Sequence, residues 1–209
     1  MAGKFITLEG GEGAGKTTCM EHVEARLREA GLDLVVTREP GGTRIGEKIR
    51  ELLLDRGNFD ILDDTELLLM FAARSQHINE LIRPAIEADT WVLCDRFTDA
   101  TYAYQGGGRD IDKSRIRELE EWVQQGLKPD LTLLLDLPVH VGLERATQRS
   151  KPDRFESENI SFMENMREAY LEIARADPGR VKIIDSSRPL EEVLEQIDSV
   201  IDDALEQHA

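Results

Sequence analysis

The chain has 209 residues, of which 40% are hydrophobic and 33% are charged, a composition typical of one globular domain with its own core. Acidic residues outnumber basic ones by 42 to 26, so the formal net charge is −16. A field of this sign repels polymeric nucleic acid, and a small anionic ligand then needs a local group of basic residues. We therefore expect a single domain over residues 1–209 that binds no nucleic acid polymer.

The sequence also argues against a membrane or secreted protein. The longest apolar runs, such as Leu131–Leu137, are far shorter than a membrane-spanning helix. Met1 leads directly into a strand-like segment without the features of a signal peptide, so we expect a cytoplasmic protein that binds no membrane. Cys19 and Cys94 form no C-x-x-C pair and predict neither a disulfide nor a metal site.

Five short apolar runs alternate with helical patterns along the chain. The runs are almost continuously apolar, as strands covered on both faces should be. They comprise residues 5–8, 34–37, 91–95, 131–136 and 181–185. This alternation predicts an α/β fold with a doubly wound five-stranded parallel sheet, in which ligands bind beyond the carboxyl ends of the strands.

Helical periodicity occupies several of the intervals between these runs. Apolar residues recur on one face of each interval, and Gly31 follows the first as a C-cap. We expect helices at about residues 20–30, 45–53, 67–78, 116–123 and 190–205.

A phosphate-binding loop follows the first strand. Residues 10–17 match the pattern G-x-x-x-x-G-K-[ST], with a strand before them and an amphipathic helix after them. Glycines let backbone N–H groups surround a phosphate, and the helix N-terminus adds partial positive charge. We expect Lys16 to contact the β- and γ-phosphates of a nucleoside triphosphate and the Thr17 hydroxyl to bind Mg²⁺.

Two aspartates at strand ends are candidates for a second Mg²⁺ contact. Asp95 ends the third apolar run and Asp136 ends the fourth. Asp95 is favoured because Arg96 follows it, which pairs a metal-side acid with a phosphate-side base. Either aspartate can instead be a structural cap at the end of its strand that binds no metal.

The loop alone indicates nucleotide binding, and other motifs narrow the class. The GTPase patterns D-x-x-G and N-K-x-D are absent, and the chain is short for a motor or transporter ATPase. A small kinase remains.

Further landmarks resemble thymidylate kinases of the bacterial type over nearly the whole chain. They stand in order and at the family's spacings, and together with the loop they are highly specific. These landmarks are residues 37–43, 72–74, 95–97, 101–109 and 149–156. The resemblance implies the P-loop nucleoside-monophosphate kinase fold, phosphorylation of dTMP to dTDP by ATP with Mg²⁺, and a homodimer.

The resemblance also implies individual roles. Arg38 and Arg96 would bind the acceptor phosphate, since arginine suits bidentate oxyanion binding. Arg74 and Gln105 would recognise thymine, while Glu12 and Tyr104 would contact the sugar. The implied dTMP-binding residues are Glu12, Arg38, Glu39, Phe71, Arg74, Arg96, Thr101, Tyr104 and Gln105. The implied ATP-binding residues are Gly10, Gly11, Glu12, Gly13, Ala14, Gly15, Lys16, Thr17, Thr18 and Arg149, with Thr17 and Asp95 toward the metal.

One position departs from many relatives. Their thymine-stacking aromatic residue lies four positions before the equivalent of Arg74, where this chain has Met70. Phe71 lies three positions before it, and both spacings share a helix face with Arg74. We expect Phe71 to stack on the base, because only Phe71 has an aromatic ring.

The basic segment from Arg149 to Arg154 resembles the lid of the family, about residues 147–157, which closes over ATP. Gly13 stands where the eukaryotic type carries an arginine in the loop. We therefore expect Arg154 to place positive charge at the transferring phosphoryl group and Arg149 to stack on adenine. The implied catalytic residues are Lys16, Glu12, Arg96 and Arg154.

Two alternatives remain open. The chain can be a P-loop kinase for another nucleoside monophosphate or a small metabolite, although the segment Thr101–Gln105 argues against this. It can also be an ATP-dependent switch protein without enzymatic activity, which would show no acceptor-dependent release of ADP.

Overall fold

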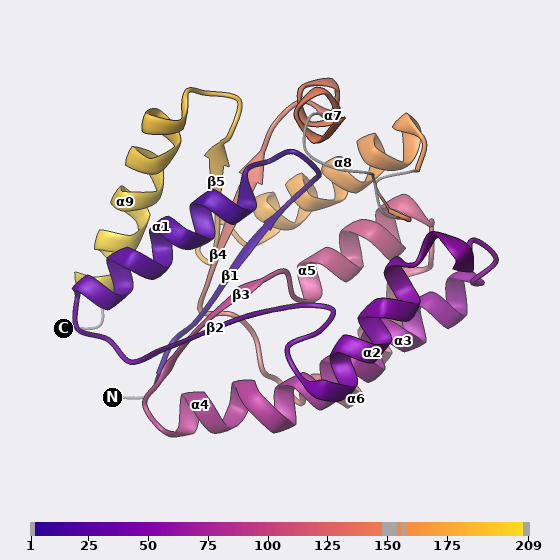
Figure 1. Ribbon diagram of the computed structural model, residues 1–209, viewed down its shortest axis with the longest axis horizontal. Helices are drawn as coiled ribbons and strands as arrows, with labels where there is room; N and C mark the ends of the chain where they lie inside the picture. The colour runs from indigo at the N-terminus through magenta and orange to yellow at the C-terminus, as the bar shows by residue number, and fades with distance from the viewer. Residues whose placement is uncertain (1–2, 148–153, 156–157, 207–209) are drawn as a thin grey trace.

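The centre of the molecule is a parallel sheet of five strands, which confirms the predicted fold class (Figure 1). The computed structural model describes residues 3–147, 154–155 and 158–206. The strand order is β2-β3-β1-β4-β5. The strands are β1 (Phe5–Gly10), β2 (Leu34–Arg38), β3 (Trp91–Asp95), β4 (Leu131–Asp136) and β5 (Val181–Asp185). Strand β1 extends beyond the predicted end at Leu8, because Glu9 and Gly10 pair with Leu134 and Leu135 of β4.

Helices cover both faces of the sheet. On one face, α1 (Lys16–Glu29) and α9 (Leu190–Glu206) lie side by side and share a buried core with alternate strand residues (Figure 1). The other face packs against α3 (Asp63–His77), α4 (Arg83–Glu87), α5 (Thr98–Thr101) and α8 (Ile160–Ala176). This two-sided covering explains the continuously apolar strands. Among the described helices, none is both long and apolar enough to cross a bilayer.

The remaining helices lie around this second layer. They are α2 (Arg44–Leu54), α6 (Lys113–Gln124) and α7 (Val139–Thr147). A π-helical segment, Ile78–Ile82, joins α3 to α4. A second one, η3 (Tyr102–Gly108), continues α5. The predicted helices are confirmed, whereas α4, α5, α7, α8, the two π-helical segments and a short 3-10 helix, η1 (Arg56–Asn58), are additional to those predicted.

The glycines of η3 explain how this segment packs against α8. A Cβ at Gly107 would lie 2.7 Å from the Ala169 side chain and 2.8 Å from the Asn165 carbonyl oxygen. A Cβ at Gly108 would lie 2.4 Å from the Phe162 ring. The missing side chains therefore let η3 approach α8 closely, and this approach positions Tyr104 and Gln105, which precede the glycines in η3.

The parallel register brings the ends of three strands together. Leu8 of β1 and Arg38 of β2 both lie beside Asp95 of β3. The phosphate-binding loop, the Asp95–Arg96 pair and the segment after Arg38 are therefore neighbours at one edge of the sheet, as the rule for ligand sites in such sheets requires.

Candidate active site

The loop between β1 and α1 has the backbone of a phosphate cradle. Gly10, Gly13 and Gly15 have φ angles of 142°, 70° and 85°, which residues with side chains rarely adopt. A Cβ at Gly13 would lie 2.1 Å from the Gly142 carbonyl oxygen of α7, so no side chain fits there. The loop therefore cannot carry an arginine at this position. This agrees with the expectation that a residue outside the loop places positive charge at the transferring phosphoryl group.

Lys16 lies at the start of α1, and its ammonium group closes over the loop. Its Nζ donates to the carbonyl oxygens of Gly10 and Gly11 at 3.2 and 3.3 Å. Burial and the neighbouring charge of Arg96 lower the pKa of Lys16. Ala14 is buried inside the loop, while Thr17 and Thr18 are exposed on the first turn of α1.

Glu12 links the phosphate-binding loop to Arg96, which follows β3, and to Tyr104 of η3. Arg96 Nη2 donates to Glu12 Oε1 at 2.9 Å and to the Tyr104 hydroxyl at 2.6 Å. The Tyr104 hydroxyl also donates to Glu12 Oε1 at 3.0 Å. Burial opposes the ionisation of Glu12, but the charges of Arg96 and Lys16 outweigh it and lower the pKa of the carboxyl to about 2. Glu12 is therefore a carboxylate throughout the physiological pH range.

The surroundings of Asp95 and Asp136 differ in a way that bears on metal binding. Asp95 Oδ1 is buried and has no hydrogen-bond partner within the described part of the chain. Asp95 lines an open groove that Thr17 also lines. Asp136 instead accepts two hydrogen bonds from Arg167, at 2.7 and 2.8 Å. The described residues contain no group of three or more His, Cys, Asp or Glu side chains that could hold a metal ion.

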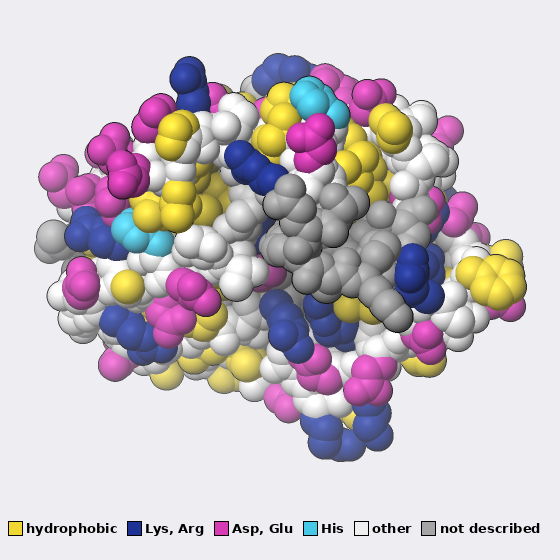
Figure 2. All heavy atoms as spheres, turned by 45° about the horizontal axis from the view of Figure 1, so that its top comes forward, with side chains coloured by type: hydrophobic (Ala, Val, Ile, Leu, Met, Phe, Trp, Pro, Cys, Tyr) yellow, Lys and Arg dark blue, Asp and Glu magenta, His cyan; other side chains and the backbone are white. Residues whose placement is uncertain are grey.

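A cavity that opens to solvent lies next to Glu12 and Arg96, between α2, α3 and η3. It brings together most of the residues that the sequence predicted for the acceptor. The predicted residues that line it are Glu12, Glu39, Arg74, Arg96, Thr101, Tyr104 and Gln105. In Figure 2 several basic side chains lie near the centre of the view, and further basic and most acidic side chains are spread around the margin.

Arg74 is held from several sides in this cavity. Its Nε donates to Glu39 Oε2 at 2.7 Å, and its Nη2 donates to the Phe97 carbonyl at 3.1 Å and to Thr101 Oγ1 at 3.0 Å. Its guanidinium carbon lies 4.9 Å from the centre of the Phe71 ring. Nη1 is buried without a hydrogen-bond partner among the described residues, and Arg74 lines the cavity.

Two predicted residues lie outside the cavity lining. Phe71 is buried in a core cluster with Leu67, whereas Met70 lines the cavity. Successive residues on a helix differ by about 100° in direction, so only one of the two can face the ligand. Arg38 is 52% exposed, pairs with Glu47 at 2.9 Å and lines the groove beside Thr17.

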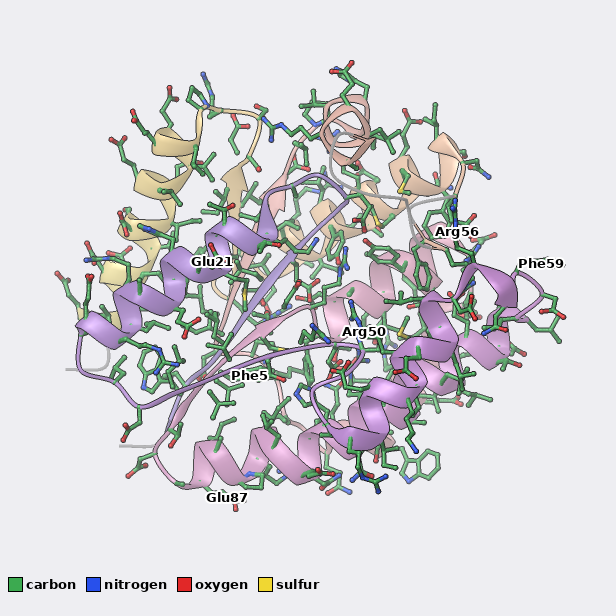
Figure 3. All side chains as sticks on the ribbon, viewed as in Figure 1. Phe5, Glu21, Arg50, Arg56, Phe59 and Glu87 are labelled. Atoms are coloured by element: carbon green, nitrogen blue, oxygen red, sulfur yellow. The ribbon has the colours of Figure 1, made fainter. Side chains whose placement is uncertain are left out.

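Arg50 of α2 lines the cavity and was missed from the sequence. Figure 3 shows its side chain extending from α2 toward the sheet. Its Nη1 donates to the Pro40 carbonyl at 2.9 Å, and burial together with the charges of Arg38 and Arg96 lowers its pKa. The available signal was its position four residues after Gly46 and three before Leu53, the two buried residues of α2. Arginines therefore gather locally in this acidic protein, as an anion site requires.

The predicted lid lies partly within the described residues. Arg149 lies outside the described residues. Arg154 is described and buried, and it donates to the Leu53 carbonyl at 2.8 Å and to Glu66 Oε2 at 2.6 Å. Its guanidinium is thus held between α2 and α3 and does not lie at the phosphate-binding loop. The physical reason is the fully buried carboxylate of Glu66, which requires cationic partners.

The fold and the site define a class of protein. A phosphate-binding loop at the end of β1, adjoining an arginine-lined cavity that can hold a second phosphorylated molecule, is the arrangement of a small P-loop kinase. A family model described as thymidylate kinase matches residues 8–197. The chain belongs to the thymidylate kinase family, and it is a phosphotransferase.

Full-length relatives agree with this assignment. A thymidylate kinase of Pseudomonas putida (strain W619) is 57% identical over 202 residues, which cover 97% of this chain and 98% of the relative. A thymidylate kinase of Methylococcus capsulatus (strain ATCC 33009 / NCIMB 11132 / Bath) is 54% identical over 206 residues, which cover 99% and 98%.

Proposed function

We propose that this protein transfers the γ-phosphoryl group of ATP to dTMP and forms dTDP. The observation that supports this proposal most directly is the position of Glu12. It belongs to the phosphate-binding loop and also lines the cavity that contains the arginines. Donor and acceptor are then held on either side of the Glu12–Arg96 pair, close enough for direct transfer.

On the donor side, backbone N–H groups of residues 10–18 and the ammonium of Lys16 bind the ATP phosphates. Thr17 and Asp95 would hold Mg²⁺ together with these phosphates, and the buried, unpartnered Oδ1 of Asp95 supports this choice over Asp136. Mg²⁺ usually takes only one or two protein ligands in such sites and supplies charge neutralisation at the phosphate oxygens. Arg149 and Arg154 of the lid serve ATP once Arg154 leaves Glu66.

On the acceptor side, Arg50 and Arg96 bind the phosphate of dTMP, with Arg38 at the edge of the groove. Arg74 Nη1 donates to O4 of thymine, and Gln105 pairs with N3–H. Met70 packs on the base in place of Phe71, which supports Arg74 from behind. A dedicated general base is not required, because phosphoryl transfer through a loose transition state depends mainly on positioning and charge neutralisation.

The test is a panel of acceptors with ATP, read as kcat/KM. The thymine methyl is one buried carbon, so its loss in dUMP should cost roughly 10- to 200-fold. UMP adds a 2′-hydroxyl against Tyr104 and should fall below dUMP. Cytosine places an amino group against Arg74 and an unprotonated N3 against Gln105, and unpaired polar groups of this kind support discrimination of about 10⁴.

The expected order is dTMP, dUMP and UMP, with dCMP and purine monophosphates at background. Phosphorylation of dCMP or dGMP as efficient as that of dTMP would overturn the substrate and leave the phosphotransfer in place. ATP binding without any acceptor-dependent ADP release would favour the switch protein. We further propose that the chain is one domain, forms a homodimer and acts in the cytoplasm.

A further inference from the structure

Glu66 is a fully buried carboxylate that belongs neither to the phosphate-binding loop nor to the lining of the acceptor cavity. Residues 66, 70 and 74 are spaced by four along α3, so Glu66 shares a helix face with Met70 and Arg74. Both of these residues line the cavity. Glu66 therefore lies about one helical turn before Met70, toward the N-terminus of α3, and there it contacts Gln105.

Among the described residues, three side chains donate to the carboxylate of Glu66. Gln105 Nε2 donates to Oε1 at 2.8 Å. Arg109 donates to Oε1 at 3.4 Å and to Oε2 at 3.2 Å, and Arg154 donates to Oε2 at 2.6 Å. The two guanidinium groups offset the cost of burying the carboxylate charge. Both contact Oε2, while the shortest hydrogen bond to Oε1 comes from the Gln105 amide.

This contact determines which end of the Gln105 amide faces a ligand. A carboxylate only accepts hydrogen bonds, so it pairs with the NH₂ end of an amide and repels the carbonyl end. Gln105 is only 1% exposed, so water cannot compensate the reversed orientation. The carbonyl oxygen of Gln105 is therefore directed away from Glu66. It is the end of the amide that a ligand in the cavity can contact.

We propose that Glu66 is a positioning residue that presents an acceptor at Gln105 and thereby selects a pyrimidine with N–H at ring position 3. This inference rests on the proposed function. Thymine and uracil donate N3–H to Gln105 Oε1, whereas cytosine presents an unprotonated nitrogen that repels it. Arg74 Nη1 supplies the matching donor for a 4-oxo group. The donor and acceptor together fit the 4-oxo, N3–H edge of a pyrimidine.

The test is the nearly isosteric change Glu66→Gln. Arg109 still requires an acceptor, also when Arg154 turns to ATP, so the new amide directs its oxygen to Arg109 and its NH₂ toward Gln105. Gln105 then pairs through its own oxygen and directs NH₂ into the cavity. We expect kcat/KM for dTMP to fall by about 10- to 100-fold and the preference for dTMP over dCMP to shrink at least about tenfold. The value for dUMP should fall as much as that for dTMP.

A compensating exchange sharpens the test. Combining Glu66→Gln with Gln105→Glu places a carboxylate where the amide was. One of its oxygens accepts from the introduced amide, and the other again accepts from N3–H. We expect the preference for dTMP over dCMP to return to within about tenfold of the parent value. The control Glu172→Gln removes the same charge from an exposed ion pair with Lys113 and should leave the preference unchanged.

Three results bear against the inference. The inference is contradicted if Glu66→Gln keeps the parent preference for dTMP over dCMP. It is also contradicted if Glu66→Gln loses dTMP and dCMP turnover in parallel, because either result assigns Glu66 only to fold stability. If Glu66→Gln fails to fold, as judged by thermal unfolding, the double exchange decides: a retained dTMP preference supports the inference and a lost one overturns it. A parent enzyme without preference for dTMP contradicts the proposed function itself.

Discussion

Arg50 and Arg38 occupy different surroundings near the proposed acceptor phosphate. Arg50 is half-buried and lines the cavity together with Arg96. Arg38 is 52% exposed, and Glu47 already pairs with its charge. Because ion pairs and hydrogen bonds of exposed groups contribute little, the two arginines should contribute unequally to the binding of dTMP.

We therefore expect Arg50→Ala to raise the KM for dTMP by about 10- to 100-fold, since a hydrogen bond to a charged group contributes about 1.5–3 kcal/mol. Arg38→Ala should raise it by less than about tenfold. Steady-state kinetics at saturating ATP measures both, and the KM for ATP serves as the internal control. The reverse order would place the acceptor phosphate in the groove beside Thr17.

At the scale of single residues, the sequence predicted the loop well and the cavity incompletely. Lys16 and Thr17 follow from a local pattern whose backbone geometry is nearly invariant with context. The choice between Met70 and Phe71 depends on about 100° of rotation around α3, which periodicity does not resolve. The contact of Glu66 with Gln105 joins positions 39 residues apart, and no local pattern indicates it.

A buried network around Glu9 connects three secondary-structure elements. Glu9 Oε1, at the end of β1, accepts from the Phe97 N–H before α5 at 2.7 Å. Its Oε2 accepts from the Tyr170 hydroxyl of α8 at 2.7 Å. Burial and the nearby charge of Asp99 raise the pKa of Glu9 to about 8, against the opposing effects of these two hydrogen bonds and of Arg96. The network therefore couples the packing of β1, α5 and α8 to pH.

The sign of this coupling follows from the raised pKa. The folded protein holds the proton on Glu9 more tightly than the unfolded chain, so the free energy of unfolding should fall as pH rises from about 4.5 to about 8. Glu9→Gln mimics the neutral acid and should lose less stability over this window, by about 1 kcal/mol per pH unit. Urea unfolding at several pH values measures the difference.

The exposed change Glu21→Gln on α1 provides the control, and its stability should follow the parent (Figure 3). Parallel pH profiles for Glu9→Gln and the parent would show that Glu9 does not take up a proton on folding in this range.

The sequence predicts some secondary-structure elements better than others. The five strands follow from continuous apolar runs, because burial on both faces leaves a clear signal. The segment η3 contains Gly106, Gly107 and Gly108, and glycine is a poor helix former. Its helical conformation depends on close packing against α8, which lies more than fifty residues later, so tertiary contacts override local propensity.

At the scale of the whole molecule, exposed apolar side chains raise the question of an assembly. Leu52 on α2, Leu68 on α3 and Trp122 on α6 are 51%, 57% and 74% exposed. These three helices lie side by side in Figure 1, with α3 packed against both α2 and α6. Apolar side chains exposed on neighbouring helices are typical of an interface between subunits. This arrangement supports the proposed homodimer, with α3 at its centre.

We expect light scattering to give twice the mass of the 23.6 kDa chain at micromolar concentration. Leu68→Glu should shift the protein toward the monomer, because dimerisation would bury its charge in an apolar interface without a partner. Leu190→Glu is the matched control. Leu190 is 52% exposed but begins α9, on the other side of the sheet, where an acidic residue also suits the helix N-terminus. A monomeric parent would contradict the homodimer, and equal dissociation by both changes would contradict the assignment of the interface to α3.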